Sequence, residues 1–115
     1  MAINGTHMLF YTSEPEQLRT MLRDAFGFKH VDAGQGWLIF ALPPGEVAVH
    51  PGDKNDVHEL YLMTDDIRAF VDAMKKREVI CSEPNDQGWG ILSQMTLPGG
   101  GKLGVYQPRH ARPEW

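Results

Sequence analysis

The sequence has a single cysteine, no cluster of basic residues and no long apolar segment. Cys81 has no second thiol to pair with, so no disulfide forms within the chain. Asp and Glu outnumber Lys and Arg, 15 to 11, and the net charge of −4 disfavours nucleic acid and anionic membranes as partners. No stretch approaches the about 18 apolar residues of a membrane-spanning helix, and no secretory signal opens the chain. We therefore expect a cytoplasmic protein.

What the chain does contain is an internal repeat. Gln-Gly-Trp occurs at 35–37 and again at 87–89, and His7 opens the run HMLFYTS as His58 opens HELYLMT. Helical apolar spacing follows each histidine run, and an apolar run follows each Gln-Gly-Trp. We predict one α+β domain over residues 1–115, in which two units, 3–51 and 57–107, each have the order β-α-β-β-β and a surface tail covers 108–115.

The local signals place the elements of both units. Ser13 is a good helix N-cap, Gly27 suits a helix C-terminus, and the glycine before each tryptophan indicates a turn that leads into a strand. The second helix has no terminating glycine and ends on basic residues, which suit the helix dipole. We expect helices at 13–26 and 66–77, and strands at 3–11, 30–32, 37–42, 47–50, 57–63, 79–81, 90–97 and 103–107.

Four segments carry a resemblance to a known family: His7 on the first strand, LRTMLRDAFGF at 18–28, HELYLMTDDI at 58–67 and PGGGKLGVYQP at 98–108. Together they resemble the vicinal oxygen chelate superfamily, which includes glyoxalase I, extradiol dioxygenases and bleomycin-resistance proteins. The resemblance implies a curved mixed sheet that forms a cup, with the helices outside, and we expect a homodimer.

In the metal-using members of that superfamily, the cup holds a divalent ion. His7 and His58 match two of the ligand positions, and neutral imidazoles suit Zn, Ni, Fe or Mn. The expected carboxylates are missing, because Gly104 and Ala48 occupy their places. His50, one pleat beyond Ala48, is the candidate third ligand, and a Gly104→Glu change is expected to raise metal affinity about tenfold or more.

Aromatic residues suggest a different occupant of the cup. Tyr106 shares a strand face with Gly104, and a glycine inside a strand often marks the close approach of a ligand. With Tyr11 and Trp37, these are the candidate ligand-binding residues, although both Trp37 and Trp89 also suit plain packing. The sequence therefore favours a protein that binds a small organic molecule, partly aromatic or amphipathic, in its cup without a complete metal site.

Two alternatives stay open at this point. One is a divalent-metal-dependent lyase or dioxygenase that uses His7 and His58 with a non-standard third ligand. The other is a duplicated domain that serves only as a partner subunit, for which nothing positive in the sequence speaks.

Overall fold

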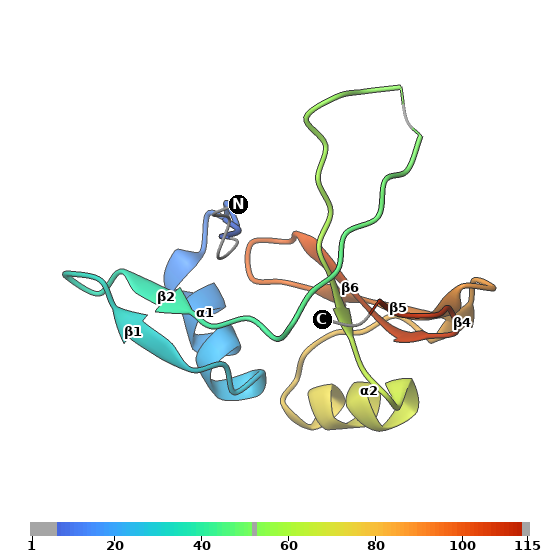
Figure 1. Cartoon of the computed structure of the whole chain (residues 1–115). Coiled ribbons are helices and arrows are strands. Elements are labelled where there is room, and N and C mark those ends of the chain that lie inside the picture. The colour runs from blue at the N-terminus through green and yellow to red at the C-terminus, as the bar shows by residue number, and fades with distance from the viewer. Residues whose placement is uncertain (1–6, 52, 114–115) are drawn as a thin grey trace.

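The structure is a computed structural model that describes residues 7–51 and 53–113. Its helices and strands, in chain order, are α1 (Pro15–Thr20), the π-helix η1 (Met21–Ala25), β1 (His30–Asp32), β2 (Leu38–Phe40), β3 (Tyr61–Met63), α2 (Ile67–Lys76), β4 (Asn85–Asp86), β5 (Gly90–Thr96) and β6 (Lys102–Pro108) (Figure 1). The α+β class predicted from the sequence is confirmed.

The second half of the chain builds the larger sheet. Its strand order is β3-β6-β5-β4; β3 runs parallel to β6, and the other pairs are antiparallel. The predicted strand at 79–81 is reduced to one bridge between Cys81 and Met95, and β4 occupies residues expected to form a loop. The element order β3-α2-β4-β5-β6 follows the β-α-β-β-β order expected for this unit.

Helix α2 covers one face of this sheet, and its ends follow local chemistry (Figure 1). The carboxylate of Asp66 accepts a hydrogen bond from the amide of Ala69 at 3.0 Å, which satisfies one free donor of the first turn. At the other end, Glu78 has a φ of 60°, a left-handed backbone conformation that glycine usually adopts at the end of a helix. The helix therefore ends where predicted without the glycine that the sequence lacks.

The first half holds α1, η1 and a two-stranded hairpin of β1 and β2. Gly27 ends the helical segment with a φ of 70°, as predicted. In the hairpin, the amide of Gly36 donates to the carboxylate of Asp32, and in the β4–β5 hairpin the amide of Gly88 donates to Asp86 at 2.8 Å. In both halves, an aspartate carboxylate thus accepts from the glycine amide of Gln-Gly-Trp, although the first turn is two residues longer than the second.

Two predicted strands are not formed. Residues 7–11, the described part of the strand expected at 3–11, and residues 47–50 lie in no sheet, and residues 1–6 fall outside the described chain. The side chains of Val47 and Val49 are 92% and 97% exposed. The alternating pattern predicted an extended backbone, but a strand also needs a hydrogen-bonded partner, which the pattern does not name. Two complete β-α-β-β-β units are therefore not found in the described residues.

The hydrophobic core lies between the helices and the large sheet. Met95 and Val105 on the two central strands are fully buried, and Leu18 and Met74 bring α1 and α2 against them. The segments 41–51 and 53–60, green in Figure 1, extend away from this core. Across the described ranges, no helix has both the length and the apolar character that a bilayer crossing requires.

Candidate functional site

Three aromatic side chains of the second half pack together at one end of the large sheet. The rings of Tyr61, Trp89 and Tyr106 are called the aromatic cluster from here on. Their centroids lie 5.0 to 6.2 Å apart, and every pair of planes meets at 74° to 87°. Edge-to-face geometry of this kind is favourable because a positive ring edge meets a negative ring face. The cluster therefore holds each ring in a fixed orientation.

Two glycines make room for the tyrosine rings. Gly104 pairs directly with Tyr61, and a methyl group on Gly104 would lie 2.5 Å from Cδ1 and 2.6 Å from Cε1 of that ring. A methyl group on Gly90 would lie 2.6 Å from Cδ2 of Tyr106. Both distances are far below a van der Waals contact, so the cluster can form only because these two strand positions have no side chain.

A carboxylate lies beside the cluster. The hydroxyl of Tyr61 donates a hydrogen bond to Oε2 of Glu59 at 2.9 Å. Burial and the adjacent Glu59 carboxylate raise the pKa of the Tyr61 phenol above its ordinary value. Among residues 7–51 and 53–113, no ion pair joins Glu59 to a basic side chain. Glu59 therefore carries a negative charge that the described chain leaves uncompensated.

The C-terminal tail contacts the other side of the cluster. The ring of His110 lies 5.7 Å from that of Tyr106, and its Nε2 is 2.9 Å from the Tyr106 hydroxyl. Arg112 binds Glu46 with an Nε–Oε1 distance of 2.8 Å. Burial and the nearby Glu46 carboxylate raise the pKa of Tyr106, against the opposing effect of Arg112. The tail predicted to lie on the surface is thus fastened to both halves of the chain.

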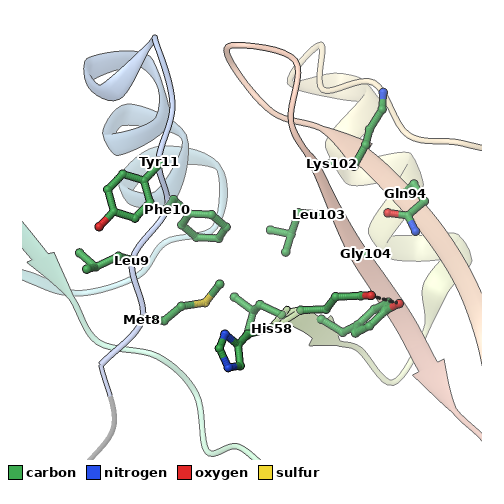
Figure 2. Close-up of a pocket in the computed structure, with 12 residues that line it drawn as sticks. Met8, Leu9, Phe10, Tyr11, His58, Gln94, Lys102, Leu103 and Gly104 are labelled. Carbon is green, nitrogen blue, oxygen red and sulfur yellow. Dashed lines mark hydrogen bonds between the residues drawn. The ribbon is translucent and has the colours of Figure 1, made fainter. Parts of the chain in front are cut away.

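A cavity of about 410 Å³ adjoins the cluster (Figure 2). On one side stands the segment Met8–Tyr11, and on the other stands β6, where Leu103 faces Phe10 across the gap. Tyr61 and Glu59 line the cavity on the side of the cluster, and Gln94 also lines it. Lys102 lines the cavity too, but its ammonium group is bonded to the Thr96 hydroxyl and points away from the hollow (Figure 2). The hollow thus combines an apolar wall, contributed by the first half, with a polar and aromatic wall from the second half.

A second and larger cavity of about 950 Å³ lies against the first half. Its lining is mostly apolar and includes side chains of α1, β2 and the 41–45 segment. Trp37 lines it with its ring under the guanidinium of Arg19, whose Cζ is 5.5 Å from the ring centroid. The tryptophan of the first Gln-Gly-Trp turn therefore already carries a cation on its face.

The four predicted ligand-binding residues fall into two places. Gly104 and Tyr106 belong to the cluster region, as expected from their shared strand face. Trp37 lines only the larger cavity, and Tyr11 lines both cavities with a side chain that is 91% exposed. Segment 8–11 separates the two cavities, so one ligand in either cavity reaches only part of this set.

The three predicted metal ligands are not gathered. His7 lines the larger cavity and His58 the smaller one. His50 lies in the extended 41–51 segment, with Nδ1 2.7 Å from the carbonyl of Pro51. Within the described residues, no group of three His, Cys, Asp or Glu side chains is placed to hold a metal ion.

The steric surroundings of Gly104 bear on the same question. A glutamate at this position would meet the Tyr61 ring at its first side-chain carbon. The expected gain in metal affinity from Gly104→Glu stays a prediction, and it requires that the Tyr61 ring move or be replaced. The donor set and the available space do not fit a divalent ion, and no metal-assisted step is derived.

Several site residues escaped the sequence reasoning. Tyr61 and Glu59 are not among the residues predicted from the sequence, and Trp89 is predicted only to suit packing. The register of β3 against β6 pairs Tyr61 with Gly104. In this position, Tyr61 contacts both Glu59 and Trp89. The one signal available in advance was the alternation of Glu59 with Tyr61, which places both on one strand face.

Comparison with known proteins gives the fold a context. No protein-family model matches the chain, and neither does any curated protein. Among solved structures, the chain is similar to TnmS3, an antibiotic binding protein from Streptomyces sp. CB03234, with 26% identity and a TM-score of 0.70 over 94% of this chain and 98% of that one.

Two further solved structures share the fold at lower identity. Lactoylglutathione lyase from Agrobacterium tumefaciens has 14% identity and a TM-score of 0.66, and the match covers 90% of this chain and 92% of that one. A member of the glyoxalase/bleomycin resistance protein/dioxygenase superfamily from Sphaerobacter thermophilus has 17% identity and a TM-score of 0.61 over 91% and 98%. The resemblance noted in the sequence is confirmed.

Proposed function

We propose that this chain, which has the fold of glyoxalase and bleomycin-resistance proteins, is a single-domain protein that binds a small, partly aromatic organic molecule without a metal. The observation that carries the proposal is the aromatic cluster beside the cavity of about 410 Å³. Concave sites lined by apolar and aromatic side chains with a few polar groups are typical of small-molecule binding. The similarity to an antibiotic binding protein supports the binding of a small molecule.

The residues predicted from the sequence take different roles in this proposal. Tyr106 belongs to the aromatic cluster, and Gly104 contributes by leaving room for the Tyr61 ring. Tyr11 forms part of the wall opposite β6, and Trp37 contacts a ligand that extends into the larger cavity. The ligand therefore contacts side chains from both halves of the chain.

The metal-dependent alternative makes a different prediction. A lyase or dioxygenase that used His7, His58 and His50 would bind a divalent ion stoichiometrically. Tag-free protein is titrated with Zn²⁺, Ni²⁺, Fe²⁺ and Mn²⁺ by isothermal calorimetry, and the metal that co-purifies is counted by mass spectrometry. One bound ion per chain, lost in both His7→Ala and His58→Ala, would establish the alternative.

The binding proposal is tested with small aromatic molecules. Quenching of tryptophan fluorescence is followed while a panel of aromatic compounds and their saturated counterparts is added. We expect aromatic members to bind with micromolar dissociation constants and Tyr106→Ala to weaken the binding. Ile80→Ala, at a side chain that is 69% exposed and outside the site, is the matched control. If no member of the panel binds below millimolar concentration, the proposal fails.

We also propose that the chain works as a homodimer in the cytoplasm. Segment 47–50 lies in no sheet and exposes the apolar side chains of Val47 and Val49, and an extended apolar segment of this kind is suited to pairing with a strand of another chain. Light scattering after gel filtration is expected to give twice the chain mass. Val47→Lys/Val49→Lys should shift the protein to monomer, whereas Val57→Lys, at another exposed valine, should leave the mass unchanged.

A further inference from the structure

We propose that the ligand is a flat aromatic cation, which stacks on Trp89 and directs its positive group to Glu59. This inference rests on the proposed function and names the chemical class of the ligand. It is carried by three features of the second half: a partly exposed tryptophan ring, a carboxylate bonded to the tyrosine that packs against this ring, and a glycine that leaves room for that tyrosine.

The ring of Trp89 is held in place but not covered. Tyr61 and Tyr106 meet it at 74° and 85°, so neither stacks on it in parallel, and the side chain remains 42% exposed. Its backbone is held as well, because the amide of Arg109 donates to the Trp89 carbonyl at 2.9 Å. A fixed ring with accessible area presents a stacking surface at little entropic cost.

The duplicated turn shows what such a ring accepts. Trp37, the equivalent residue of the first half, has the Arg19 guanidinium over its face at 5.5 Å. In the described residues, no Lys or Arg lies over Trp89. A planar, positively charged group is therefore the partner that one tryptophan of the pair has and the other lacks, and cation–π attraction is strongest for tryptophan.

The charge near the cluster supports a cation. Asp86 is paired with Arg109, and Glu46 is paired with Arg112, so these carboxylates are compensated within the chain. Among the described residues, the one side chain that donates to Glu59 is Tyr61, and no basic side chain pairs with this carboxylate. The Tyr61 hydroxyl donates to Glu59 at 2.9 Å, and the centroid of the Tyr61 ring lies 6.2 Å from that of Trp89. The carboxylate and the indole therefore contact the same tyrosine, and a fused-ring cation stacked on Trp89 directs its charge along this tyrosine toward Glu59.

Gly104 sets this arrangement because it lets Tyr61 lie across β6. A methyl group at Gly104 must displace the ring that links Glu59 to Trp89, since it would lie 2.5 Å from Cδ1. Gly101, in the same hairpin, offers a matched control: a methyl group there meets nothing within 4 Å. The pair Gly104→Ala and Gly101→Ala separates the loss of Tyr61 placement from the general effect of an added methyl group.

The experiment uses three probes on the full chain. Proflavine is a planar tricyclic cation, 1-adamantylamine is a saturated cation, and anthracene-2-sulfonate is a planar anion. Dissociation constants are measured by calorimetry at fixed ionic strength. We expect proflavine to bind about tenfold more tightly than either of the other two probes, because only proflavine has both a flat ring system and a positive charge.

The variants locate the site. Trp89→Leu and Glu59→Gln should each weaken proflavine about tenfold, whereas Asp72→Asn, which removes one charge from the exposed side of α2, should not. Gly104→Ala should weaken it in the wild-type background and have no further effect in Tyr61→Ala, because both changes act on one ring. Circular dichroism and thermal unfolding of each variant verify that the protein is folded.

The outcomes separate this inference from the proposed function. Tight binding of anthracene-2-sulfonate or of another aromatic compound, unaffected by Trp89→Leu and Glu59→Gln, would overturn the cation site and leave the binding function standing. Failure of all aromatic compounds to bind would overturn both. If Gly104→Ala does not fold, the cycle is replaced by Tyr61→Phe, which keeps the ring, removes the Glu59 bond and should change proflavine affinity less than Tyr61→Ala.

Discussion

Arg112 and Glu46 form an ion pair between positions that are 66 residues apart in the chain. The Nε–Oε1 distance is 2.8 Å, and His110 Nε2 lies 4.0 Å from the second oxygen of the same carboxylate. The pair fastens the tail to the first-half segment just beyond the aromatic cluster. Sequence patterns gave no reason to expect this contact, because the tail has no periodicity and the two residues share no motif.

This ion pair is expected to contribute little to stability. The side chains of Arg112 and Glu46 are 46% and 21% exposed, and pairs of this kind are worth about 1 kcal/mol or less. A double-mutant cycle with Arg112→Ala and Glu46→Gln, followed by urea unfolding, should give a coupling in that range. The coupling should shrink in 1 M NaCl, and a large coupling that resists salt would contradict the assignment.

The central strand residue Met95 is expected to be one of the most sensitive positions. Its side chain is fully buried between β5 and the helices, so truncation leaves a cavity. Met95→Ala should lower the free energy of unfolding by about 2–5 kcal/mol, measured by urea denaturation. Ile80→Ala, which removes an exposed side chain, should stay within about 0.5 kcal/mol of the parent protein.

The N-terminus of α2 offers a test of local capping. The Asp66 carboxylate accepts from the Ala69 amide at 3.0 Å, and Asp66→Ala leaves that donor without its partner. The variant should lose about 1 kcal/mol of stability in thermal unfolding. Asp65→Ala changes the neighbouring residue and removes the same charge. Equal losses in the two variants would show that the charge matters and the cap does not.

The two tyrosines of the aromatic cluster are expected to ionise at a higher pH than ordinary phenols. Burial raises the pKa of both Tyr61 and Tyr106 above 10.0, so folding favours their neutral forms. The stability from this source is fully present below pH 10 and is lost as the pH rises through the raised values. A pH titration followed by absorbance at 295 nm should show phenols that ionise above the ordinary pKa. Tyr61→Phe and Tyr106→Phe should each remove one of them. Ionisation of all tyrosines at one ordinary pKa would refute the cluster.

Much of the second half follows from local sequence. The apolar spacing after Asp66 gave α2 to within a residue at each end, and the alternation around Met95 and Leu103 gave β5 and β6. The first half was predicted less well at its edges. Segments 7–11 and 47–50 have the composition of strands, yet pairing depends on distant backbone groups that local sequence does not identify.

The candidate site was predictable only in part. Gly104 and Tyr106 were singled out because a glycine inside a strand demands a reason. The reason given, a missing metal ligand, came from the resemblance, whereas the space is filled by Tyr61. The pairing of β3 with β6 decides this, and a shift of one residue would have placed Leu60 or Leu62 there instead.

The contact between Tyr61 and Gly104 determines the order in which substitutions at these two positions can be made. Any side chain added at 104 must wait until residue 61 has become smaller, since the tyrosine ring fills the space that even a single methyl group needs. Any route to a carboxylate at 104 therefore begins with a change at residue 61 on the neighbouring strand. The same constraint holds for anyone who redesigns this sheet, for whom position 61 is the first to change.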